Sequence, residues 1–140
     1  MNIIASQFSL LGHLKPFIFI YMSIHYVVIL PLIFLKRISD VFVDELYYLD
    51  NDKETPEVLA DADHSLVNFY IPKGYRWNDI LSKTGNLREF LTDVTRKIAR
   101  ENPELEGVID TIDFNQSISG QRAISDDSLH ALIQQLNKKS

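Results

Sequence analysis

The sequence contains no cysteine, which excludes disulfide bonds, thiolate metal sites and cysteine nucleophiles. The five glycines are isolated from one another, so no glycine-rich loop is present to hold a phosphate or a cofactor. The four histidines lack the spacing of metal ligands, and no serine lies in a Gly-x-Ser-x-Gly turn. We therefore expect no catalytic, cofactor-binding or metal-binding residues in this chain.

The sequence also has fewer basic residues than acidic ones, with 14 Lys and Arg against 19 Asp and Glu. The formal net charge of −5 gives no overall electrostatic attraction to nucleic acid. Any contact with DNA would need a local basic face or a larger assembly. The 140 residues are enough for one domain with a real hydrophobic core.

Charged residues are absent from a run of twenty residues, from Pro16 to Leu35. This run is as long as a membrane-spanning helix, and Lys15 and Lys36 flank it. Two interpretations follow from the run alone. It either spans a membrane at residues 16–35, or it contains the first buried helix of a globular domain.

The apolar pattern continues beyond the run with the spacing of one helical face, at Ile38, Val41, Phe42 and Leu46. This spacing predicts a helix from about Tyr26 to Tyr48. Pro31 cannot donate the helical hydrogen bond, so it is expected either to kink this helix or to mark its start.

The remaining segments predict a mainly α, bundle-like small domain, with room for one short strand or hairpin near residues 67–72. A short helix is expected to begin at Trp77, whose ring is more easily explained as a core anchor than as a base-stacking group. Residues 105–114 are expected to form another short helical piece.

Two further helices have clearer patterns. The stronger one is expected near residues 87–98, with Pro103 after its end. Ser125 is expected to cap the last helix, whose first turn carries two acids. The apolar faces of these two helices consist of Leu87, Phe90, Leu91, Val94 and Ile98, and of Leu129, Leu132, Ile133 and Leu136.

Seven basic residues are candidate contacts to DNA or a partner by charge alone: Lys36, Arg37, Lys73, Arg76, Arg96, Lys97 and Arg100. Arg96, Lys97 and Arg100 lie within about a quarter turn of one helix, opposite its apolar stripe. Acids share that side, which favours a mixed solvated face over a phosphate site. For Lys36 and Arg37 the polar edge of a core helix is likewise the favoured interpretation.

Three blocks of the sequence are specific in combination: "FLKRISD" at residues 34–40, Pro72-x-Gly74-x-Arg76-Trp77, and "NPEL" at residues 102–105. Together they resemble the N-terminal helical domain of the modification subunit of type I restriction-modification DNA methyltransferases. The resemblance extends in order over about residues 26–138. It implies a domain that assembles with specificity, modification and restriction subunits and helps to close the complex around DNA.

In that family an S-adenosylmethionine-dependent domain methylates adenine N6 after flipping the base out of the helix. The family's cofactor loop and Asn-Pro-Pro-Phe tetrapeptide lie downstream of the matched region. No cofactor or catalytic residue can therefore be assigned here, and the chain alone is expected to be inactive. Asn102-Pro103 is followed by Glu104, so we interpret it as the end of a helix.

Residues 1–24 do not resemble the polar start of family members, so we expect an atypical apolar leader followed by the domain at residues 25–140. The resemblance favours a buried core helix over a membrane anchor, and the cytoplasm as the location. A helical domain without its neighbours would expose apolar surface, so self-association is also expected.

Overall fold

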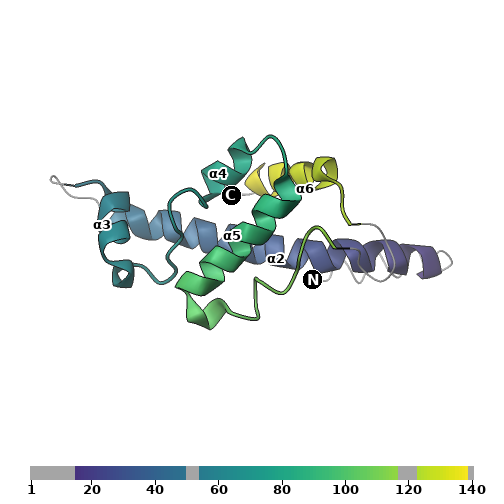
Figure 1. Cartoon of the computed structure of the whole chain (residues 1–140), viewed down its shortest axis with the longest axis horizontal. Coiled ribbons are helices and arrows are strands. Elements are labelled where there is room, and N and C mark those ends of the chain that lie inside the picture. The colour runs from purple at the N-terminus through teal and green to yellow at the C-terminus, as the bar shows by residue number, and fades with distance from the viewer. Residues whose placement is uncertain (1–14, 50–53, 117–122, 139–140) are drawn as a thin grey trace.

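The computed structural model describes residues 15–49, 54–116 and 123–138, with side chains from residue 27 onward. In these ranges the regular structure is entirely helical, which confirms the mainly α fold class (Figure 1). The elements are α2 (Lys15–Tyr48), α3 (Pro56–Ala62), the 3₁₀ turn η2 (His64–Leu66), α4 (Trp77–Ser82), α5 (Leu87–Glu101), the 3₁₀ turn η3 (Pro103–Leu105) and α6 (Asp126–Lys138).

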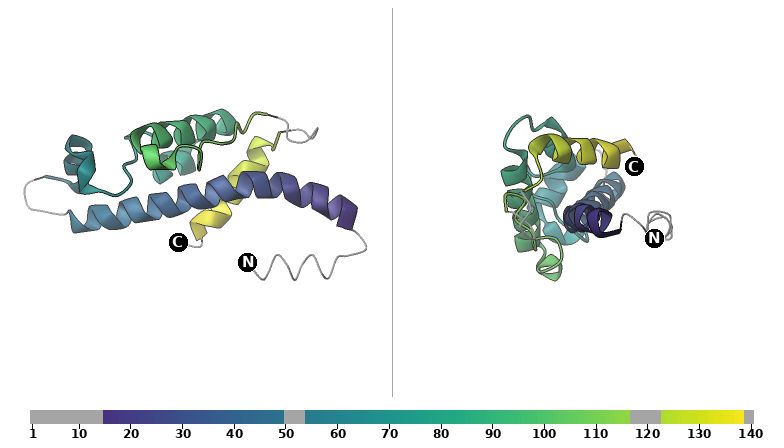
Figure 2. Two further views of the ribbon diagram at one scale, coloured as in Figure 1. Left: turned by 90° about the horizontal axis from the view of Figure 1, so that it is seen from below. Right: turned by 90° about the vertical axis from the view of Figure 1, so that its right-hand side faces the viewer.

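Helix α2 is the longest of the described helices. Its 34 residues correspond to a length of about 50 Å, and it begins eleven residues before the predicted start at Tyr26. Pro31 lies inside the helix, so it does not mark the start. Figure 2 shows that α2 bends near the middle of its length, as expected for a proline that removes a helical hydrogen bond.

The other helices pack on one face of α2. Figure 2 shows α3, α4 and α5 along one side of α2, with α6 crossing it. Helix α6 contacts both α2 and α5, and α3 also contacts α2. The buried face of α2 carries Val28, Leu32, Leu35, Ile38, Phe42 and Leu46. One face of the second half of the apolar run is therefore part of a protein core, whereas Val27, Leu30, Ile33 and Phe34 are exposed.

The predicted strand near residues 67–72 does not form in the described chain. The backbone of Tyr70 instead pairs with a side chain that imitates a neighbouring strand. The Asn102 Oδ1 atom accepts a hydrogen bond from the Tyr70 N–H at 2.9 Å, and Nδ2 donates to the Tyr70 carbonyl at 2.8 Å. Nδ2 also donates to the Ile98 carbonyl at 2.7 Å.

Asn102 therefore does more than end a helix. It follows the last residue of α5, as the sequence predicted, and it is only 4% exposed. Its amide fastens the extended segment to the C-terminus of α5, a contact between residues 32 positions apart.

The prediction of a helix at residues 105–114 is wrong. Only η3 is helical there, and the chain continues as turns in which Gly107 has a positive φ of 76°. This left-handed backbone interrupts an α-helix. Ile109 and Phe114 are nevertheless buried, so the turns are held by core packing.

The start of α6 also holds the start of α5. Ser125 caps α6 as predicted, because its Oγ accepts a hydrogen bond from the Ser128 N–H at 3.1 Å. Asp126 then accepts hydrogen bonds from the backbone N–H groups of Leu87 and Arg88 at 3.4 and 3.2 Å. A carboxylate at a helix N-terminus satisfies free donors and favours the helix dipole.

Candidate nucleic-acid and partner interface

The structure separates the seven candidate basic residues into enclosed and exposed groups. Lys36 is 8% exposed and pairs with Asp40 one turn along α2. Its Nζ atom lies 5.2 Å from the centroid of the Trp77 ring. Trp77 is itself 8% exposed and donates from Nε1 to Asn137, which confirms it as a core anchor. The positive charge of Lys36 is therefore paired with Asp40 and lies against Trp77 within the domain.

The guanidinium of Arg76 is also hydrogen-bonded within the fold. Its Nε donates to the Ile71 carbonyl at 3.0 Å, and its Nη2 donates to Asp61 Oδ1 at 2.6 Å. Its guanidinium lies 5.1 Å from the centroid of Phe42. Arg76 therefore joins α2, α3 and the segment before α4.

Tyr70 completes this cluster by donating from its hydroxyl to Asp61 Oδ1 at 2.7 Å. Partial burial opposes the charged form of Asp61, but the hydrogen bonds from Tyr70 and Arg76 and the positive charge of Arg76 outweigh it and lower the pKa of that carboxyl. Burial, together with the hydrogen bond to Asp61, raises the pKa of Tyr70 to about 12.

Replacing Asp61 with asparagine is expected to cost about 1 kcal/mol at neutral pH, because the ion pair is partly exposed and screened. The lowered pKa means that wild-type stabilisation is complete above the ordinary Asp pKa of 3.8 and is lost as pH falls through the folded-state value. Urea unfolding at pH 7 and pH 2.5 should show the wild-type advantage shrinking at acid pH. An advantage that is unchanged or larger at pH 2.5 would contradict this assignment.

The exposed group is concentrated on the outer side of α5. Arg96 and Arg100 are exposed there, and Lys97 is half-buried beside them. The Lys97 Nζ atom lies 5.9 Å from the centroid of the Tyr75 ring. Lys73 is exposed on the turn two residues before Tyr75, whereas Arg37 lies on the exposed face of α2.

Sequence reasoning missed an aromatic pair beside these cations. The Tyr75 and Phe90 rings stack with centroids 6.1 Å apart, and the Lys83 Nζ atom lies 5.0 Å from the Phe90 centroid. Phe90 was predicted on the apolar stripe of α5, but it lies at the edge of that stripe, half-buried. No sequence spacing links Tyr75 to Phe90, because a turn and a whole helix separate them.

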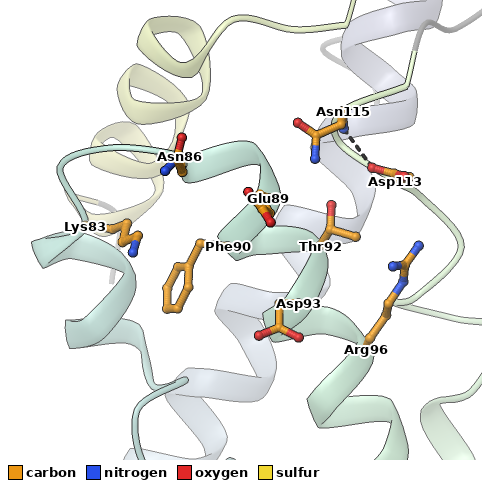
Figure 3. Close-up of a pocket in the computed structure, with 9 residues that line it drawn as sticks. All are labelled: Lys83, Asn86, Glu89, Phe90, Thr92, Asp93, Arg96, Asp113 and Asn115. Atoms are coloured by element: carbon orange, nitrogen blue, oxygen red, sulfur yellow. Dashed lines mark hydrogen bonds between the residues drawn. The ribbon is translucent and has the colours of Figure 1, made fainter.

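A polar cleft of about 670 Å³ runs along the same side of α5 (Figure 3). Lys83 and Phe90 lie at one end and Arg96 at the other, with Asp93 between them. Glu89 also lines the cleft between its two ends, and Asp113 lies at the same end as Arg96. The charge and hydrogen bond of Asp93 raise the pKa of Tyr75, with the charge as the larger cause.

The outer side of α5 is therefore divided by charge. Glu89 and Asp93 lie in its N-terminal half, and Arg96, Lys97 and Arg100 lie in its C-terminal half, which ends in exposed Glu101, paired with His64. Polyanion phosphates would meet repulsion at the first half and attraction at the second. The exposed side of α5 therefore carries charges of both signs.

The glycines of the described residues are dispersed. Gly74, Gly85 and Gly107 lie singly in separate turns, so no stretch of backbone is cleared of side chains for close approach of a cofactor. In the same part of the chain, no group of three or more His, Asp or Glu side chains is placed to hold a metal ion.

Where side chains are described, we find no helix that is both long and apolar enough to cross a membrane. The predicted span at residues 16–35 is only partly covered by this finding, since residues 16–26 lie outside the described side chains.

Together these features define a small all-helical domain with an internal ion-pair cluster and a locally basic helix face. The family described as HsdM N-terminal domain matches residues 25–136. The chain belongs to this family, which places it with the modification subunits of type I restriction-modification methyltransferases. No curated protein matches the chain.

Proposed function

We propose that this chain is the assembly and DNA-clamping domain of a type I restriction-modification methyltransferase that modifies adenine at N6. The observation that carries the proposal is membership of the HsdM N-terminal domain family over residues 25–136. The basic C-terminal half of α5 supports it, because a clamp needs cations that reach phosphates without reading bases.

In this proposal the chemistry belongs to other parts of the complex. The S-adenosylmethionine pocket and the catalytic residues lie in the family's methyltransferase domain, and the specificity subunit reads the target. This chain holds the complex closed on cytoplasmic DNA. It needs a catalytic domain and a specificity subunit as partners.

The proposed contacts to DNA are Lys73, Arg96, Lys97 and Arg100. Lys36 and Arg76 are left out because their charges are satisfied within the fold. Arg37 is left out because it lies on α2, on the face that also carries exposed Ile33 and Phe34. That apolar face is a reason to expect self-association when partners are absent.

The test of assembly uses a type I modification subunit from which its own N-terminal domain has been deleted, together with its specificity subunit. The chain is expected to co-elute with these two proteins in gel filtration as one complex. An unrelated helical protein of similar size and charge is the control. Elution of the chain apart from both subunits at micromolar concentrations would contradict the proposed function.

A further inference from the structure

One long face of α2 is not covered by the rest of the described domain. Helices α3, α4 and α5 lie along the other side of α2 (Figure 2). The residues of the uncovered side follow one another at alternating intervals of three and four, which is the spacing of the seam between two paired helices. All of them are exposed except Val41, which is half-buried. We call this side the outer face of α2, and it consists of Val27, Leu30, Phe34, Arg37, Val41, Asp44 and Tyr48.

The outer face is apolar towards the N-terminus of α2. Val27, Leu30 and Phe34 are 39–45% exposed, and Ile33 beside them is equally open. A shallow groove of about 90 Å³ continues this apolar surface onto α6. The groove is lined by Ile29, Leu32, Leu132, Gln135 and Leu136. A continuous exposed apolar surface on a helix is typical of a site that binds another helix.

The other end of α2 carries two aromatic side chains that are not packed into the core. Tyr47 and Tyr48 are 79% and 83% exposed, and their rings contact each other edge to face with centroids 5.6 Å apart. Tyrosines are frequent anchors in protein interfaces, because the ring buries a large apolar area. Tyr48 lies about five helical turns after Leu30, and Tyr47 about five turns after Ile29. The two tyrosines therefore lie on the same sides of α2 as the apolar surface and its groove.

Two charges lie on the outer face between the apolar end and the tyrosines. Arg37 and Asp44 are exposed, and neither has an ion-pair partner among the described residues. They are about 10 Å apart along the helix axis, which is too far for them to pair with each other. A second α2 in parallel register would place Arg37 beside Arg37 and Asp44 beside Asp44, which is repulsive. An antiparallel α2 would place each Arg37 beside the Asp44 of the other helix.

We propose that α2 pairs with the α2 of a second copy of this chain, with the two helices antiparallel and in contact through their outer faces. Tyr48 of each copy lies against Leu30 of the other, and Tyr47 lies at the mouth of the groove. Arg37 and Asp44 form two equivalent ion pairs between the copies. Because each copy contributes the same surface, the arrangement closes at two chains.

A second copy fits this surface because one chain carries all the complementary parts. The apolar end of the outer face matches the aromatic end, and the positive charge matches the negative one. The pairing uses none of the cations on α5 and no DNA. It is therefore independent of the proposed function, and it concerns the chain free of other subunits.

Sedimentation equilibrium of the full chain tests the ion pairs at micromolar to sub-millimolar concentrations. The wild-type chain is expected to form dimers. Arg37→Asp places two acids together at each contact, and Asp44→Arg places two cations together, so each variant should dimerise at least about tenfold more weakly. An equimolar mixture of the two variants should dimerise like wild type, because every contact again joins opposite charges. Glu104→Arg makes the same change in net charge at an exposed residue elsewhere, and it should leave dimerisation unchanged.

Crosslinking tests the orientation, because the chain has no cysteine of its own. A mixture of Leu30→Cys and Tyr48→Cys should be joined efficiently by a short bis-maleimide. Either variant alone should be joined poorly, because identical positions lie about 25 Å or more apart in the antiparallel pair.

Four results would overturn the proposal. The first is a wild-type chain that stays monomeric throughout this concentration range. The second is association that persists undiminished in both single variants, which would assign it to another surface or to the apolar residues 1–24. The third is a mixture of the two charge variants that dimerises no better than either alone. The fourth is crosslinking of Leu30→Cys to itself as readily as to Tyr48→Cys.

Discussion

Asn102→Ala is expected to destabilise the domain by about 3–5 kcal/mol. The substitution removes three buried hydrogen bonds and leaves the N–H and carbonyl of Tyr70 without their partners. Each buried backbone group left unsatisfied costs about 1–3 kcal/mol. Urea unfolding followed by far-ultraviolet circular dichroism measures this loss.

Two variants show whether the amide itself is responsible. Asn102→Asp keeps an acceptor for the Tyr70 N–H but places a carboxylate against the carbonyls of Tyr70 and Ile98, so at neutral pH it should be no better than alanine. Asn115→Ala, at an exposed asparagine, should change stability by less than about 0.5 kcal/mol. A loss below 1 kcal/mol for Asn102→Ala would show that the hydrogen bonds of the Asn102 side chain contribute little to the stability of the domain.

Neutralising the basic half of α5 is expected to have the largest functional effect. The triple variant Arg96→Gln, Lys97→Gln and Arg100→Gln should reduce the affinity of the assembled complex for duplex DNA about a hundredfold near 150 mM salt. The expected mechanism is loss of counterion release, worth about 0.9 in the slope of log K against log salt for each phosphate contact. The slope should therefore fall by about 2.7.

The control for this variant is the pair Arg37→Gln and Lys138→Gln, which removes two exposed positive charges elsewhere on the surface. This pair should leave both the affinity and the slope nearly unchanged. Fluorescence anisotropy of labelled DNA between 50 and 300 mM salt measures both quantities. An equal loss in the control would mean that only net charge matters and that α5 is no interface.

Local patterns in the sequence predicted the helices that have clear periodicity and caps. Of the five residues predicted on the apolar face of α5, all but Phe90 are buried. Ser125 was correctly predicted to cap the start of α6. Trp77 was also correctly predicted as the first residue of a helix. These features depend on residues within one or two helical turns.

The features that were missed depend on distant contacts. The extended segment at Tyr70 resembles a strand in its alternation, but its hydrogen-bonding partner is a side chain 32 residues away. The 105–114 segment has helical composition, yet Gly107 and the burial of Ile109 and Phe114 hold it as turns. For the same reason, charge alone could not separate enclosed Lys36 and Arg76 from the cations on α5.

If this chain closes a type I complex on DNA, the rate of DNA release reports that closure most directly. The modification subunit without its N-terminal domain is assembled with its specificity subunit on labelled duplex, and excess unlabelled duplex is then added. We expect that adding this chain slows release at least tenfold, and that adding the α5 triple variant slows it much less. An unchanged rate of release in the presence of a co-eluting chain would contradict the clamp.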